Sequence, residues 1–170
     1  PENIFLCNQG GLVDFPKVLD FGLAKVTEQQ MQPGSMILTQ EGMVFGTPEF
    51  MSPEQAQGRT LDARSDIYSL AVILYEVLTG KLPFDAKTPM EYIQKHVTAP
   101  IIPLNERVEG MSFPEGLGKV LEKALQKKPE DRYQTAAELG NALKPFANEG
   151  QGTDNTWADA PTSPQSPRQG

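Results

Sequence analysis

The sequence predicts a mainly helical fold with one small β-hairpin near its start. Apolar runs alternate with turn residues only in the first twenty-two residues, and helix-capping patterns recur from residue 52 onward. The 170 residues, 38% of them hydrophobic, suffice for one domain with a sizeable core. We therefore expect two strands, a long loop and then about five helices.

The hairpin is expected from two apolar runs, one at residues 4–7 and one that ends at residue 19. Two glycines lie between them and tolerate the positive φ that such turns need. Pro16 should make the second strand start late or lie at a sheet edge. Residues 24–45 lack periodicity and predict a long mobile loop, a kind of segment that is usually functional or disordered.

Capping residues and apolar spacing predict the helices. Three capping boxes mark helix starts: Ser52 with Gln55, Thr88 with Glu91, and Thr135 with Glu138. Residues 66–79 are apolar nearly all round, which predicts a buried helix. A further helix is expected over about 117–125, with Pro129 as its stop, after an irregular connection at 100–110. Pro145 should fray the end of the last helix.

Composition and charge exclude several classes of function. The net charge is −7 and no basic run is longer than Lys127-Lys128, so we expect no nucleic-acid partner. His96 is the only histidine, which leaves little for imidazole triads or multi-histidine metal sites. No apolar run approaches the roughly 18 residues of a membrane span, and no signal-like leader opens the chain. With Cys7 as the single cysteine, the sequence predicts a cytoplasmic segment without membrane contact.

Four motifs follow one another in a fixed order. Asn3 closes the first, Asp20-Phe21-Gly22 forms the second, residues 46–54 (GTPEFMSPE) the third, and residues 65–69 (SDIYS) the fourth. Together they resemble the activation segment and its surroundings in a eukaryotic-type serine/threonine protein kinase. Residues 14–20 and 62–70 look most like bacterial members of that family.

The resemblance implies that the chain is the carboxyl-terminal lobe of the two-lobed (α+β) protein kinase fold, without the amino-terminal lobe. Residues 1–147 would be the partial kinase domain, and the Pro-, Ser- and Gly-rich residues 148–170 a disordered tail or linker. In the family pattern H-R-D-L-x-x-x-N, Asn3 takes the last position. The aspartate that accepts the substrate proton would then lie three residues before Pro1.

The resemblance also assigns a nucleotide site. Asn3 and Asp20 would hold the Mg2+ ions that bridge the phosphates of ATP, a task that suits hard oxygen ligands. Phe5 and Leu19 would form the apolar floor under the adenine, although strand core explains both residues equally well. Alone, Asp20 would be read as a turn residue before glycine and Asn3 as a loop cap.

Two threonines are assigned to substrate recognition and regulation. Thr47 would line the groove for the residue after the phosphoacceptor, which indicates serine or threonine substrates; otherwise it is a turn residue before Pro48. Thr39 would carry the activating phosphate, whose charge could order the loop against basic side chains. Ser35 and Thr27 compete with Thr39 for this role.

Other residues would have conformational or structural roles. By resemblance, Phe21 is an apolar plug that separates active from inactive states, and Gly22 is its hinge. Glu54 and Arg132 look like a buried ion pair that ties the end of the activation segment to a loop between late helices. Asp66 would support the catalytic loop through hydrogen bonds; otherwise it is a helix-start carboxylate that the dipole favours.

The sequence thus predicts part of a kinase that transfers the γ-phosphate of ATP to serine or threonine of protein substrates. Residues 1–170 alone should be inactive, because the glycine-rich loop, the strand lysine and the proton-accepting aspartate are absent from them. The alternative is a pseudokinase or kinase-derived module that binds a partner without phosphoryl transfer. The missing amino-terminal lobe is an expected partner in either case.

Overall fold

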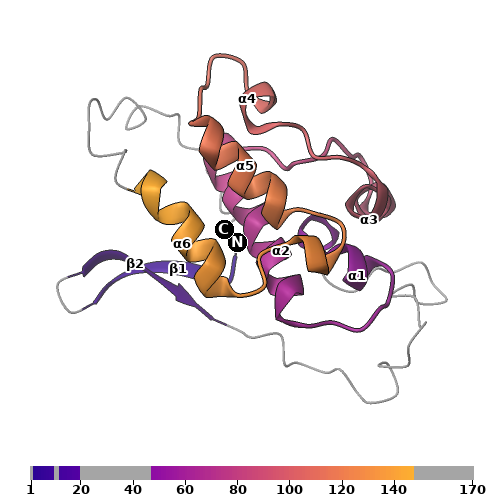
Figure 1. The fold of residues 1–170 in the computed structure, drawn as a ribbon, viewed down its shortest axis with the longest axis horizontal. Coiled ribbons are helices and arrows are strands. Elements are labelled where there is room, and N and C mark those ends of the chain that lie inside the picture. The colour runs from indigo at the N-terminus through magenta and orange to yellow at the C-terminus, as the bar shows by residue number, and fades with distance from the viewer. Residues whose placement is uncertain (1, 10–11, 20–46, 148–170) are drawn as a thin grey trace, which may run out of the picture.

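The computed structural model of the chain describes residues 2–9, 12–19 and 47–147 (Figure 1). This part is mostly helical and contains one two-stranded antiparallel sheet, as the sequence predicts. Its elements are β1 (Ile4–Gln9), β2 (Leu12–Val18), the 3-10 helix η2 (Pro48–Phe50), α1 (Pro53–Ala56), α2 (Ala63–Thr79), α3 (Pro89–Thr98), α4 (Leu104–Arg107), α5 (Glu115–Ala124), the 3-10 helix η3 (Pro129–Asp131) and α6 (Ala136–Ala147). The expected loop at 24–45 and the expected tail at 148–170 lie outside the described residues.

The hairpin extends from one side of the helical body (Figure 1). Cys7 pairs with Phe15 and Gln9 with Leu12, so β2 has one residue more than β1 between these pairs. This bulge coincides with Asp14, whose φ of 58° is left-handed. Pro16 lies inside β2, so the expected late start of this strand is wrong. The edge alternative fits, because both strands of a two-stranded sheet are edges.

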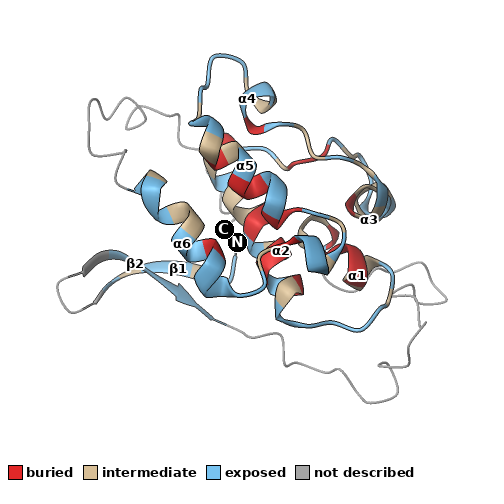
Figure 2. Ribbon diagram, viewed as in Figure 1, coloured by how far each residue is buried: buried red, intermediate tan, exposed pale blue. Residues whose placement is uncertain are grey.

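The core lies where α2, α5 and α6 pack together, and buried residues line the facing sides of these helices (Figure 2). Tyr68 and Tyr75 of α2 and Leu121 of α5 are fully buried. The core cluster as a whole contains Ile67, Tyr68, Ala71, Val72, Tyr75, Leu104, Leu117, Val120, Leu121, Ala124, Leu125 and Leu139. Aromatic residues from one helix and aliphatic residues from its neighbours therefore supply most of the apolar burial.

Helix starts follow the capping residues closely. The Ser52 and Gln55 box is complete, since each side chain accepts a hydrogen bond from the other residue's backbone N–H, at 3.2 and 2.8 Å. At α3, Thr88 caps Glu91, but the Glu91 carboxylate accepts from the N–H of Lys87, one residue earlier than a capping box requires. The capping residues therefore predicted where these helices begin. Which backbone N–H the Gln55 or Glu91 side chain binds in return depends on the local direction of the backbone.

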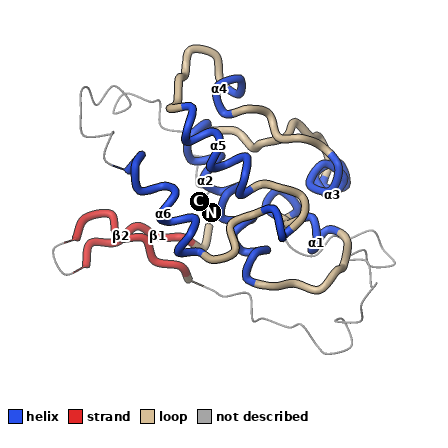
Figure 3. Tube along the Cα trace, viewed as in Figure 1, coloured by secondary structure: helices blue, strands red, loops and turns tan. Residues whose placement is uncertain are grey.

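Three helical expectations differ from the structure. Helix α2 begins at Ala63, and its Val77 is 72% exposed, so the expectation of burial all round is wrong for this face. Between α3 and α5, where an irregular connection was expected, the chain forms α4 (Figure 3). Helix α6 continues past Pro145 to Ala147, because Phe146 packs against the core and holds the last turn in place. Within the three described ranges, no helix is both long and apolar enough to cross a membrane.

Candidate functional site

One face of the hairpin collects three of the predicted nucleotide-site residues. The carbonyl of Asn3 accepts a hydrogen bond from the N–H of Leu19 at 2.8 Å, and Phe5 lies opposite Lys17. Because side chains alternate along a strand and opposite residues share a face, Asn3, Phe5 and Leu19 point to the same side. Lys17 shares that face, although the sequence motifs assign it no role at the nucleotide site.

This face of the hairpin is partly exposed, and the place of Phe5 and Leu19 under the adenine stays a prediction. Phe5 is 50% exposed and Leu19 is 43% exposed, so neither is buried among the described residues. Asn3 is exposed as well, and its amide oxygen is a hard ligand of the type that Mg2+ prefers. Asp20 follows Leu19 directly in the sequence but, like Phe21, Gly22 and Thr39, lies outside the described residues. Within the described ranges, no group of three or more His, Cys, Asp or Glu side chains is placed to hold a metal ion.

A second part of the site is the stretch from residue 47 to residue 54, here called the anchored segment. Thr47 at its start is exposed, whereas the next residue, Pro48, is buried. The carbonyl of Phe50 accepts a hydrogen bond from the Ser69 hydroxyl of α2 at 2.7 Å. The carbonyl of Glu49 lies 3.0 Å from Nε2 of His96 on α3. The helical body therefore holds this segment by its backbone and leaves Thr47 open to solvent.

The anchored segment ends in a buried ion pair between Glu54 and Arg132. The two guanidinium nitrogens Nη1 and Nη2 lie 2.7 and 2.8 Å from the two carboxylate oxygens. The remaining three N–H groups of Arg132 donate to the carbonyls of Arg64, Gln126 and Lys127. All five donors are thus used, which a buried guanidinium requires. The structure therefore brings together two residues that stand 78 positions apart in the chain.

Hydrogen bonds decide the charge state of Glu54. Burial by itself would raise the pKa of this carboxyl group, but the hydrogen bonds from Arg132 and Ser65 outweigh burial and hold the pKa below its ordinary value of 4.5. The Ser65 hydroxyl donates to Oε1 at 2.7 Å. Asp66, one residue further along α2, is exposed in the first turn, and its supporting role stays a prediction.

His96 is fully buried and connects two helices to the anchored segment. Its Nδ1 lies 3.0 Å from the hydroxyl oxygen of Tyr68, and its Nε2 faces the Glu49 carbonyl. A carbonyl only accepts, so Nε2 carries the proton and Nδ1 accepts from the tyrosine. Burial lowers the pKa of His96 to about 4, and the nearby ammonium group of Lys127 acts in the same direction. The imidazole is therefore neutral at pH 7.

The anchoring residues His96, Ser65 and Ser69 were not assigned to the site from the sequence. The two serines belong to the motif at 65–69, but serine alone does not reveal what its hydroxyl reaches. The sequence signal at His96 is that it is the single histidine of the chain and lies within an expected helix. Its partners are 28 and 47 residues away, and no local spacing predicts such contacts.

The class of protein follows from comparison with known families. The family model described as protein kinase domain matches residues 1–142, which include the hairpin, the anchored segment and most of α6. The chain therefore belongs to the protein kinase domain family.

Individual relatives place the chain among serine/threonine-protein kinases of bacteria. It is 42% identical to serine/threonine-protein kinase Pkn1 of Myxococcus xanthus over 144 residues, which are 85% of the chain and 20% of that protein. Against serine/threonine-protein kinase PknB of Mycobacterium leprae it is 47% identical over 139 residues, 82% of the chain and 21% of that protein. PknB of Mycobacterium tuberculosis H37Rv is 48% identical over 139 residues, with the same coverage. The chain spans about a fifth of the length of these relatives.

The Glu54 and Arg132 pair makes a stability prediction. Glu54→Gln should lower the free energy of unfolding of the chain by about 3–5 kcal/mol, because Arg132 is left buried without its counter-charge. Urea unfolding followed by circular dichroism measures this loss. Glu115→Gln is the matched control, since Glu115 pairs with Lys119 on the exposed surface of α5, and it should leave the unfolding midpoint unchanged. Equal midpoints for the two variants would contradict the proposed importance of the buried pair.

His96 predicts a dependence of stability on pH. The unfolded chain, in which the histidine pKa returns to about 6.5, binds a proton more strongly than the folded chain, whose His96 pKa is about 4. The free energy of unfolding should therefore fall as the pH drops from 6.5 to 4, by about 3 kcal/mol in total. Burial lowers the pKa of Lys127, the cation that acts on His96, only to about 8, so this ammonium group stays charged throughout the window.

The variant His96→Gln isolates this contribution. Glutamine keeps an N–H that reaches toward Glu49 but has no group that titrates between pH 4 and 6.5. Its urea-unfolding free energy should vary less with pH in this window than that of the natural chain. The same pH slope in both proteins would show that other groups cause the acid sensitivity.

Proposed function

We propose that residues 1–147 are the carboxyl-terminal lobe of a kinase that transfers the γ-phosphate of ATP to serine or threonine residues of protein substrates. The observation that carries this proposal is the anchored segment, which the body holds at Glu49, Phe50 and Glu54 while Thr47 stays exposed. A segment fixed in this way offers a preformed edge against which a substrate peptide can lie. Pre-organisation of this kind is the main contribution of a protein to phosphoryl transfer.

The hairpin face forms the nucleotide end of the proposed site. Phe5 and Leu19 offer exposed apolar surface for a planar base, and Asn3 lies on the same face. Asn3 and Asp20 would hold Mg2+, which neutralises phosphate charge when it is bound. The Asn3 carbonyl, which accepts from the N–H of Leu19, keeps the ligand asparagine next to the strand that leads to Asp20.

The rest of the proposal concerns what lies around this lobe. Apolar side chains are also exposed on the face of the hairpin opposite Phe5, at Leu6 and Val18. Such surfaces usually contact another part of the assembly, and an amino-terminal lobe is the partner that we propose for them. Residues 148–170 would be a linker, and a cytoplasmic location would give the kinase its ATP.

Phosphoryl transfer by the complete protein tests the proposal. With radiolabelled ATP and a generic protein substrate, residues 1–170 alone should transfer no label above the buffer blank, whereas the complete protein should transfer label.

Asp20→Asn in the complete protein should lower kcat at least about a hundredfold, as loss of a key electrostatic group does. Asp14→Asn is the control, because this exposed hairpin residue has a left-handed φ that asparagine also tolerates. An inactive complete protein would favour a partner-binding pseudokinase, and an active 170-residue chain would contradict the predicted inactivity.

Thr39 is the proposed site of the activating phosphate. Phosphopeptide mapping of the active complete protein should find a phosphate on Thr39, and Thr39→Ala should lower activity because the added charge no longer orders the loop. Ser35→Ala and Thr27→Ala serve as controls and should leave the activity unchanged. Active protein without phosphate on Thr39 would rule this residue out.

A further inference from the structure

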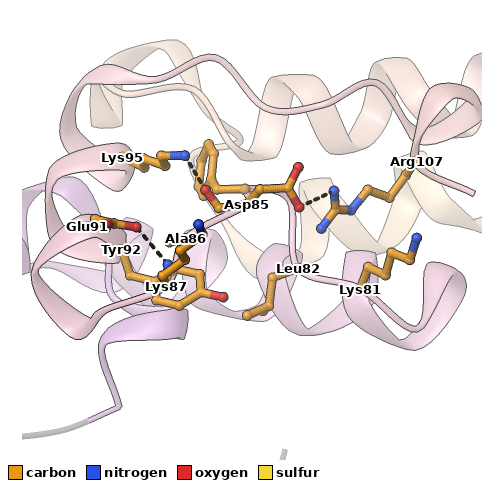
Figure 4. Close-up of a pocket in the computed structure, with 10 residues that line it drawn as sticks. Lys81, Leu82, Asp85, Ala86, Lys87, Glu91, Tyr92, Lys95 and Arg107 are labelled. Carbon is orange, nitrogen blue, oxygen red and sulfur yellow. Dashed lines mark hydrogen bonds and ion pairs between the residues drawn. The ribbon is translucent and has the colours of Figure 1, made fainter.

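A hollow of about 470 Å³ lies beside α3, and Figure 4 shows the side chains that line it. Its walls come from the connection between α2 and α3, from α3 itself and from α4. The charged side chains that line it are Lys81, Asp85, Lys87, Glu91, Lys95 and Arg107, and we call this hollow the basic pocket. Four of the six are cations in a chain whose net charge is −7, so the pocket departs from the character of the whole surface.

Both carboxylates of the basic pocket are already engaged within the protein. Asp85 Oδ1 lies 2.7 Å from Nη1 of Arg107. Glu91 Oε2 accepts a hydrogen bond from the backbone N–H of Lys87 at 2.7 Å, just before the start of α3. Glu91 therefore neutralises a helix end rather than a lysine side chain.

The three lysines of the basic pocket have no acidic partner among the described residues. Lys95 donates from Nζ to the backbone carbonyl of Asp85, which satisfies a donor but carries no negative charge. The ammonium groups of Lys81 and Lys87 form no ion pair with any residue in the part of the chain that the structure describes. Cations gathered around a hollow raise the local concentration of anions. The pocket thus has the electrostatic character of an anion site.

Arg107 adds an independent observation. Its side chain is 9% exposed, yet it makes one hydrogen bond, to Asp85, and its buried Nε has no partner among the described residues. Arg132, the other buried arginine, uses all five of its donors. A buried guanidinium with unused donors is costly, and carboxylate or phosphate oxygens are its best acceptors. Figure 4 shows Arg107 and Lys81 at the same end of the pocket.

Helix α3 places the basic pocket next to the proposed substrate site. His96 faces the anchored segment through the Glu49 carbonyl, and the preceding residue, Lys95, lines the pocket. Helix α3 packs against η2, which Thr47 directly precedes, so the helix that forms one wall of the pocket also contacts the anchored segment. A protein that lies along the anchored segment therefore passes close to the pocket.

We propose that the basic pocket binds an anionic side chain, a phosphorylated residue or a carboxylate, of the protein substrates at a position away from the acceptor hydroxyl. This inference rests on the proposed kinase function for the identity of the partner. It adds a substrate class, acidic or previously phosphorylated proteins, that the anchored segment alone does not specify. The binding itself involves no covalent step.

The first test is to titrate the 170-residue chain with inorganic phosphate. The change in backbone amide chemical shifts in nuclear magnetic resonance spectra measures the binding. Shifts should concentrate at residues 81–95 and at Arg107, and potassium chloride at equal ionic strength should not reproduce them. Lys81→Gln and Lys87→Gln should each weaken binding about two- to fivefold, the range for loss of one exposed charge pair. Arg107→Lys should weaken it as well, since lysine lacks the planar fork.

The matched control is Lys144→Gln on α6, an exposed lysine that does not line the pocket, and this variant should leave the affinity unchanged. Shifts spread over the whole surface, or equal weakening by Lys144→Gln, would overturn the proposal. Exposed Lys81 and Lys87 are not part of the core, so their variants should keep the natural spectrum elsewhere.

Peptides then distinguish the source of the anion. Three peptides of one sequence, with phosphoserine, glutamate or glutamine at the central position, are titrated into the same chain. If only the phosphoserine peptide binds more tightly than the glutamine peptide, the pocket selects phosphorylated proteins. If the glutamate peptide also binds more tightly than the glutamine peptide, the pocket accepts acidic proteins as well. Binding of free phosphate without preference for either charged peptide would overturn the proposal. Because no phosphoryl transfer is measured, failure here is separable from failure of the kinase assay.

Discussion

The buried pair of Glu54 and Arg132 is the interaction on which the arrangement of this protein depends. It joins the end of the anchored segment to the chain after α5, and Arg132 also donates to the carbonyl of Arg64 in the first turn of α2 and to those of Gln126 and Lys127 after α5. Two opposite charges out of water are tolerated only when every donor and acceptor is matched. One guanidinium group thus joins α1, the first turn of α2 and the connection after α5.

A polar chain leads from this pair to the other end of the anchored segment, where the substrate is proposed to bind. The guanidinium of Arg132 lies 4.8 Å from the ring centroid of Tyr68, and the hydroxyl of Tyr68 meets His96, which in turn holds the Glu49 carbonyl. Burial raises the pKa of Tyr68 above its ordinary value, so this hydroxyl keeps its proton and remains a donor at neutral pH. The position of the anchored segment is thus set from both ends, by Glu54 directly and by Glu49 through His96.

Sequence reasoning was most successful where a local signal decides the outcome. Capping residues such as Ser52 and Thr88 predicted helix starts, because their side chains bond within three residues. It was least successful where the answer depends on distant partners: His96 was read only as an isolated histidine, and Val77 was expected to be buried because it is apolar. Glu54 and Arg132 were paired through resemblance to a family, since nothing near either residue in the sequence reveals the other.

The two-sided use of α3 has a thermodynamic consequence. Lys95 and His96 are neighbours in the sequence, yet one lines the basic pocket and the other binds the anchored segment. If binding on one side of α3 depends on the exact position of this helix, it is thermodynamically linked to binding on the other side. Such linkage is reciprocal. An anion held at one side would then change the affinity for a peptide at the other by the same factor as the peptide changes the affinity for the anion.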